Sequence, residues 1–197
     1  PEIYTSRCSS AASDVYKRQV LVLGKPLGAG VMSAALKKNE LDDAGYAQMI
    51  AMTTRLNTPG PDLAALPGVH ALTDVTGFGL GGHLLEMMRG AGCEARVDWA
   101  SVPLMKDVRK LAEQGHVTGA SGRNWASYGA EITLSGNLSD LDSALLTDPQ
   151  TSGGLMVSCA PSALDDVLAT FVRHGFDDAA VVGEVISTSE TPGVIVG

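Results

Sequence analysis

The central stretch of the chain carries the clearest alternation of hydrophobic and polar positions. An apolar run, Val69–Thr73, predicts a strand that delivers the carboxylate of Asp74 onto a glycine-rich turn. A helix with one apolar face is predicted to begin near Gly79, because apolar side chains recur at i, i+4, i+7 and i+8 from Leu80 to Met88. This order is typical of an anion-binding site, since amides without partners at a helix start attract anions.

Further strands and helices are predicted on either side of this stretch. The strands are expected at Val20–Leu23, at Cys93–Trp99, directly after Gly154 and at Ala179–Ile186. The helices are expected at Val31–Lys38, at Leu41–Asn57 with Asn39 as its N-cap, at Pro103–Gln114 and at Leu164–Val172. These elements alternate irregularly, without the regular rhythm of a doubly wound fold.

Two polar segments interrupt the pattern and are expected to be loops. The segment Gly119–Gly129 contains Arg123, which could clamp an anion or pair with a surface acid. The segment Asp148–Gly154 combines hydroxyl side chains with two glycines, and Asp148 could belong to a site or only satisfy turn amides. Lys25, which lies between a strand and a glycine-rich helix start, is either a phosphate contact or a solvated lysine.

Composition and charge narrow the classes of partner. The 197 residues are 45% hydrophobic, enough for one globular core, and no run approaches the roughly 20 apolar residues that cross a bilayer. The net charge of -8 repels nucleic acid and anionic membranes, so neither is an expected partner. Any phosphate ligand must therefore be held by local amides, a metal ion or a few cations.

The cysteines and histidines give no sign of a metal cluster. Three cysteines are far apart without a CxxC pair, which favours a reducing compartment and argues against a disulfide framework or a structural zinc site. The four histidines show no helical metal-ligand spacing, and His83 is assigned to the core or to solvent contact. Asp74 has two interpretations: it holds Mg²⁺ beside a phosphate, or it caps the following helix.

Residues 1–19 do not resemble the rest of the chain. They are serine-rich and have neither the hydrophobic core of a signal peptide nor a sustained periodicity. We expect them to be a disordered, non-native leader outside the fold. Cys8 lies in this leader, and nothing near it in the sequence is expected to activate its thiol.

Four motifs occur in an order that resembles the selenophosphate synthetase (selenide, water dikinase) family. They are Gly24–Gly28 (GKPLG), Leu72–Leu80 (LTDVTGFGL), Gly122–Gly129 (GRNWASYG) and Asp148–Gly154 (DPQTSGG). The first two have relatives across the larger superfamily of aminoimidazole ribonucleotide synthetase, thiamine monophosphate kinase and the hydrogenase maturation factor. The last two are more particular to selenophosphate synthetase.

The resemblance implies an α+β fold, a mixed β-sheet packed with helices, as in the C-terminal domain of that superfamily. It implies a homodimeric cytosolic enzyme that converts ATP, selenide and water into selenophosphate, AMP and orthophosphate with Mg²⁺. Asp74 matches the metal-coordinating aspartate of this domain. Candidates for contacts to the phosphates are Thr73, Thr76 and Gly77, followed by Arg123, Asn124 and Asp148.

The resemblance covers residues 20–197 and corresponds to the C-terminal portion of the family. The family's catalytic cysteine or selenocysteine, catalytic lysine and glycine-rich nucleotide loop belong to an N-terminal domain that we expect to be missing. We therefore assign no catalytic residue in the chain and expect it to be inactive alone. Two alternatives stay open: another superfamily enzyme such as phosphoribosylformylglycinamidine cyclo-ligase, and a noncatalytic binding or dimerisation domain.

Overall fold

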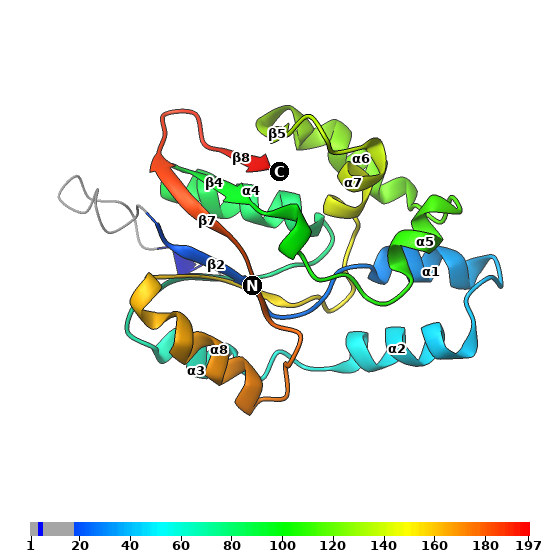
Figure 1. Ribbon diagram of the computed structural model, residues 1–197, viewed down its shortest axis with the longest axis horizontal. Coiled ribbons are helices and arrows are strands. Elements are labelled where there is room, and N and C mark those ends of the chain that lie inside the picture. The colour runs from blue at the N-terminus through cyan, green and yellow to red at the C-terminus, as the bar shows by residue number, and fades with distance from the viewer. Residues whose placement is uncertain (1–3, 6–17) are drawn as a thin grey trace.

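The computed structural model describes residues 4–5 and 18–197, which form a mixed sheet with helices on both of its faces (Figure 1). The strands are β1 (Tyr4–Thr5), β2 (Val20–Leu23), β3 (Val69–Asp74), β4 (Cys93–Val97), β5 (Ile132–Leu134), β6 (Leu155–Cys159), β7 (Ala180–Thr188) and β8 (Gly193–Val196). The α-helices are α1 (Ala29–Lys37), α2 (Asp43–Thr54), α3 (Gly60–Ala65), α4 (Gly79–Ala91), α5 (Val108–Glu113), α6 (Gly119–Tyr128), α7 (Asp140–Leu146) and α8 (Leu164–Arg173). Short 3₁₀ turns occupy Trp99–Ser101, Gly129–Glu131 and Pro161–Ala163.

The eight described strands follow the order β1-β3-β6-β2-β7-β4-β8-β5. Neighbours are antiparallel from β1 through β4, whereas β8 runs parallel to both β4 and β5. The α+β class with a mixed sheet is therefore confirmed. Asp74, the last residue of β3, pairs with Leu155, the first residue of β6. The end of β3 therefore lies beside the start of β6.

The two faces of the sheet support two hydrophobic clusters. In β2, Val22 joins a smaller cluster with α3 and α8, whereas Leu21 and Leu23 join the larger cluster with α1 and α4. Figure 1 shows α3 and α8 together on one side of the sheet and α4 on the other. This division follows from the alternation of side chains along a strand. Along the described residues, every helix is too short or too polar to cross a lipid bilayer.

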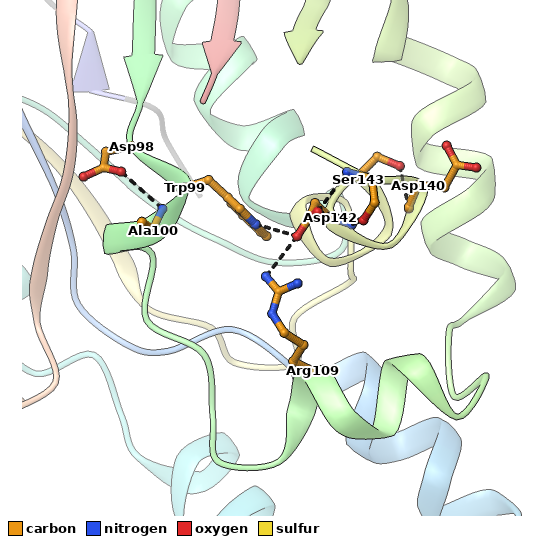
Figure 2. A network of polar contacts seen from close by, with 8 residues as sticks. Asp98, Trp99, Ala100, Arg109, Asp140, Asp142 and Ser143 are labelled. Carbon is orange, nitrogen blue, oxygen red and sulfur yellow. Dashed lines mark hydrogen bonds and ion pairs between the residues drawn. The ribbon is translucent and has the colours of Figure 1, made fainter. Parts of the chain in front are cut away.

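A buried carboxylate joins three elements at the start of α7 (Figure 2). Asp142 Oδ1 accepts hydrogen bonds from Trp99 Nε1 at 2.8 Å and from Arg109 Nη2 at 2.9 Å, and Asp142 forms a capping box with Ser139. Burial alone would raise the pKa of Asp142, but the hydrogen bonds from Ser139, Trp99 and Arg109 outweigh it and hold the pKa far below its usual range. The contacts fix α5 and the turn after β4 against α7.

Most predicted elements agree with the structure to within a few residues. The strand at Val20–Leu23 is confirmed, as are the strand that ends at Asp74 and the helix that begins at Gly79. The helix predicted at Pro103–Gln114 begins only at Val108. Six of the described helices and strands were not predicted, and they are α3, α6, α7, β1, β5 and β8.

Two local predictions were wrong. The expected loop Gly119–Gly129 is largely the helix α6, whose first turn is capped by the Thr118 side chain accepting from the Ser121 amide at 3.1 Å. The expected N-cap Asn39 instead has a left-handed backbone, with φ of 57°, and Asp42 caps α2 by accepting from the Gly45 amide at 2.7 Å. In both places one hydrogen-bonding side chain next to the helix decides where it begins.

The expectation for residues 1–19 concerns mostly residues outside the described part of the chain, and Cys8 lies there too. Two short parts of the segment are described. Tyr4–Thr5 pairs antiparallel with β3, and Gln19 is buried, with its carbonyl accepting from the Val185 amide. The structured fold therefore already includes Gln19, and the non-native origin of the segment stays a prediction.

Phe171 tests the smaller cluster. Its side chain is fully buried and packs against the ring of Phe176 at a centroid distance of 6.0 Å. Phe171→Ala should lower the free energy of unfolding by about 3–5 kcal/mol, because truncation leaves a cavity in the packed interior. The neighbouring Val172 on α8 is 58% exposed, so Val172→Ala should change the free energy of unfolding by about 0.5 kcal/mol or less. Equal losses in urea denaturation would contradict the described packing.

Candidate functional site

The candidate site is an open cavity of about 730 Å³ at the end of β3. Asp74 and Thr76 lie along its wall, whereas Val75 between them is fully buried and its amide donates to the Gly154 carbonyl at 2.9 Å. Asp74 and Thr76 therefore face the cavity, whereas Val75 faces the interior. The residues that line the cavity are Asn57, Leu72, Thr73, Asp74, Thr76, Gly77, Phe78, His83, Glu86 and Leu155.

The structure brings together four of the residues selected from the sequence. Thr73, Asp74, Thr76 and Gly77 all line this cavity. The later glycine of the motif has a different use: Gly79 has φ of 68°, and a Cβ there would lie 2.8 Å from the Cα of Thr147. Its backbone conformation and this close approach both favour glycine. The start of α4 thus packs against the segment that follows α7 and does not line the cavity.

Asn124 holds the turn that lines the cavity. Its Nδ2 donates to the Gly77 carbonyl at 2.9 Å and to the Thr147 carbonyl at 3.0 Å. One turn further along α6, the Tyr128 hydroxyl donates to the Phe78 carbonyl. The GRNWASYG motif is therefore a helix whose side chains hold the turn after Asp74. Arg123 lies exposed on the same helix and does not line this cavity.

Asp148 is buried beneath the start of α1. Its Oδ2 accepts from the Gly30 amide at 3.0 Å and from Gln150 Nε2 at 2.9 Å. Gln150 Oε1 accepts from the Gly28 amide at 3.0 Å, so the two side chains cap a helix that lacks a cap from its own N-cap residue. Burial raises the pKa of Asp148 to about 6, although the hydrogen bonds from Gln150 and Gly30 oppose the rise. The phosphate role of Asp148 stays a prediction: its Oδ2 is already engaged here, whereas its buried Oδ1 has no hydrogen-bond partner among the described residues.

Lys25 is not the solvated lysine considered from the sequence, and its contact with a phosphate stays a prediction. Its side chain is buried, and its Nζ donates to the carbonyls of Arg55 at 2.6 Å and Ser152 at 2.7 Å. Burial, aided by the nearby Arg55 guanidinium, lowers the pKa of Lys25 to about 8. The ammonium group therefore ties the end of α2 to the Asp148–Gly154 loop.

His83 and Glu86 belong to the cavity, although the sequence interpretation placed His83 in the core or in solvent. His83 Nε2 lies 3.1 Å from Thr76 Oγ1, and His83 Nδ1 lies 3.4 Å from Glu86 Oε2. Burial lowers the pKa of His83, while Glu86 and Asp74 act in the opposite direction. The signal that could have found the pair is its i, i+3 spacing on the predicted helix, one turn after the aspartate motif.

The donor set fits one side of a Mg²⁺ site. Asp74 offers a carboxylate, and Thr73 and Thr76 offer hydroxyl oxygens, the hard ligands that Mg²⁺ prefers. Within residues 4–5 and 18–197, however, no three His, Cys, Asp or Glu side chains are grouped so that they could hold a metal ion. Further ligands would have to come from phosphate oxygens, water or another part of the protein.

Comparison with protein families identifies the domain. Residues 19–195 match the family described as AIR synthase related protein, C-terminal domain. The chain belongs to this family. The domain is 66% identical over 167 residues to the protein named selenide, water dikinase of Burkholderia ambifaria (strain MC40-6), a match that covers 85% of the chain and 47% of the relative.

Other relatives and solved structures agree with this assignment. The selenide, water dikinase of Pseudomonas straminea is 58% identical over 185 residues, covering 94% of the chain and 51% of the relative. The domain thus spans about half the length of the curated relatives it matches. The crystal structure of E. coli HypE superposes with a TM-score of 0.65 at 23% identity, covering 91% of the chain and 46% of HypE. Thiamine-monophosphate kinase from Stenotrophomonas maltophilia K279a has a TM-score of 0.58 at 18% identity, covering 92% of the chain and 52% of that kinase, and these two likenesses concern the fold.

Asn124 provides a test of the support behind the cavity. Asn124→Ala should lower the free energy of unfolding by about 1–2 kcal/mol, because the Gly77 and Thr147 carbonyls lose a shared donor. Its exposed neighbour is the control, and Arg123→Ala should change the free energy of unfolding by about 0.5 kcal/mol or less. Urea denaturation measures both. A larger loss for Arg123→Ala would contradict the assigned role of Asn124.

Asp148 predicts a pH dependence of stability. The folded protein binds its proton more tightly than the unfolded chain, because its pKa is about 6 when folded against an ordinary 3.8. This contribution to stability is complete below pH 4 and is lost as the pH rises through 6, by roughly 2–3 kcal/mol. Asp148→Asn has no such proton, so the difference in unfolding free energy between wild type and variant should change across pH 4–7. If the difference in unfolding free energy stays constant across this pH range, the raised pKa of the buried Asp148 carboxyl is contradicted.

Proposed function

We propose that the domain is the C-terminal half of a selenophosphate synthetase and that its cavity forms part of the site where ATP is consumed. The 66% identity to a protein named selenide, water dikinase carries the proposal. The position of Asp74 in an open cavity at a strand end supports it. The reaction proposed is the conversion of ATP, selenide and water to selenophosphate, AMP and orthophosphate, in a cytoplasmic homodimer.

In this proposal the residues of the cavity bind and orient the ATP phosphates. Asp74 would supply one carboxylate ligand to Mg²⁺, and Thr73 and Gly77, which line the same cavity, would contact the phosphates. When bound, Mg²⁺ would neutralise the negative charge that develops during phosphoryl transfer. The buried Val75 and the hydrogen bonds from Asn124 and Tyr128 keep the turn in a fixed position, so that little reorganisation is needed when the ligand arrives.

The apolar residues of the cavity offer a surface that the other half of the proposed enzyme would cover. Phe78 is 53% exposed, and Leu72 and Leu155 lie along the same cavity. An exposed aromatic ring beside a polar site is costly in water and becomes favourable when another domain buries it. This surface is consistent with a chain that spans about half of its curated relatives.

Of the alternatives, another superfamily enzyme is disfavoured by the names of the relatives. The curated relatives at 50–66% identity are named selenide, water dikinase, whereas the solved kinase and HypE structures are at most 23% identical. A noncatalytic binding domain differs from the proposal in one respect that can be measured: its function would not depend on a carboxylate at position 74.

The proposal predicts the effect of Asp74→Asn in a two-domain enzyme in which residues 19–197 replace the matching half of the Burkholderia ambifaria relative. Mg²⁺-dependent ATP consumption should fall by at least about 100-fold, because the metal loses a charged ligand. Asp165→Asn, on the first turn of α8, is the control and should leave turnover unchanged. Unchanged turnover in Asp74→Asn, with its circular dichroism spectrum also unchanged, would refute the assignment.

A further inference from the structure

The hydroxyl group of Thr76 has a fixed partner on the wall of the cavity. Its Oγ1 lies 3.1 Å from Nε2 of His83, which is only 8% exposed. The main chain of Thr76 is held as well, because its carbonyl accepts from the Gly79 amide at 3.0 Å and from the Gln150 amide at 2.9 Å. With the backbone and the hydroxyl both engaged, the direction of the remaining lone pairs on Oγ1 is determined by which atom of the pair carries the proton.

Glu86 decides which atom carries it. A carboxylate only accepts hydrogen bonds, and Glu86 Oε2 lies 3.4 Å from His83 Nδ1, so this contact favours a proton on Nδ1. In a neutral imidazole, Nε2 then has only a lone pair and must accept the hydrogen bond from Thr76. The hydroxyl proton of Thr76 is thereby directed at His83 and is not available to a ligand.

This arrangement limits what Thr76 can bind. When the Thr76 hydroxyl donates its hydrogen bond to His83, Oγ1 presents only lone pairs to the cavity. It can then act only as a hydrogen-bond acceptor or a metal ligand. Ionised phosphate oxygens are acceptors too, so a direct hydrogen bond from the Thr76 hydroxyl to a phosphate is excluded in this arrangement. A divalent cation, or a water molecule bound to one, is the complementary partner for a hard oxygen beside a carboxylate.

The geometry points to Thr76 Oγ1 as a second oxygen donor to the cation at Asp74, directly or through a metal-bound water, with His83 and Glu86 as the positioning residues. The inference rests on the proposed function, since it requires a cation at Asp74. It also revises the expected role of Thr76, which changes from a neighbour of the phosphates to a partner of the metal. Asp74 and Thr76 are suited to this because they line one cavity from alternate positions of the same segment.

The first test reads the tautomer of His83 in the intact chain. In ¹H–¹⁵N spectra that detect imidazole nitrogens, His83 should show a protonated Nδ1 and an unprotonated Nε2 at neutral pH. In Glu86→Gln, whose side-chain amide can also donate, this tautomer should no longer dominate. A proton on Nε2 in the wild type, or an unchanged pattern in Glu86→Gln, would overturn the inference.

The second test uses Mn²⁺ alone as the probe of the cation site. In a titration of a ¹⁵N-labelled two-domain enzyme that carries residues 19–197, Mn²⁺ should broaden the amide signals of Thr76 and Gly77, and Thr76→Val should weaken the apparent affinity by about 10-fold. Thr76→Ser keeps the oxygen and should restore the affinity to within about twofold of wild type. Equal affinities for wild type and Thr76→Val would overturn the role of Thr76.

The same titration separates this inference from the proposed function. Asp74→Asn should abolish the Mn²⁺ broadening near residue 76, whatever the role of Thr76. If broadening there is absent in the wild type or persists in Asp74→Asn, the cation site at Asp74 is refuted and the inference falls with it. If Asp74→Asn abolishes the broadening and Thr76→Val leaves the apparent Mn²⁺ affinity unchanged, the cation site stands. Only the inference about Thr76 and His83 then fails.

Discussion

The hydrogen bond from the Gln150 amide to the Thr76 carbonyl joins the two segments on which the site depends. On one side, the side chains of Gln150 and Asp148 cap the amides at the start of α1. On the other side, the carbonyl of Thr76 belongs to the turn that carries Asp74 into the cavity. A helix N-terminus, a buried loop and the turn after Asp74 are thus fixed by one another, and the burial of the Asp148 carboxyl is the energetic cost of that arrangement.

Asp74 and Glu86 are the carboxylates that line the cavity, and Glu86 contacts His83, so the described residues offer only part of the proposed cation site. Mg²⁺ requires several oxygen ligands in near-octahedral geometry, and Asp74 with its neighbouring hydroxyls provides only one side of such a shell. The cavity is open, with the ring of Phe78 at its rim and more than half exposed. The same two features are expected of a domain whose curated relatives are about twice its length.

Sequence patterns predicted the elements that depend on residues close in the chain, and they missed features that depend on distant residues. The strand that ends at Asp74 and the helix α8 follow directly from hydrophobic periodicity, and the family motifs located Asp74, Thr76 and Gly77 in one cavity. The helix α6 was not predicted, because its segment is polar and its side chains are held by distant carbonyls. The burial of Lys25 was missed for the same reason, since its acceptors are carbonyls 30 and 127 residues away.

The account depends most on a divalent cation at the carboxylate of Asp74. Anomalous diffraction tests this directly in crystals of a two-domain enzyme that carries residues 19–197, grown with Mn²⁺ and a non-hydrolysable ATP analogue. We predict an anomalous peak within about 2.0–2.6 Å of an Asp74 carboxylate oxygen, the range of metal–oxygen bonds to hard cations. Metal and nucleotide bound elsewhere, with no peak at Asp74, would contradict the account.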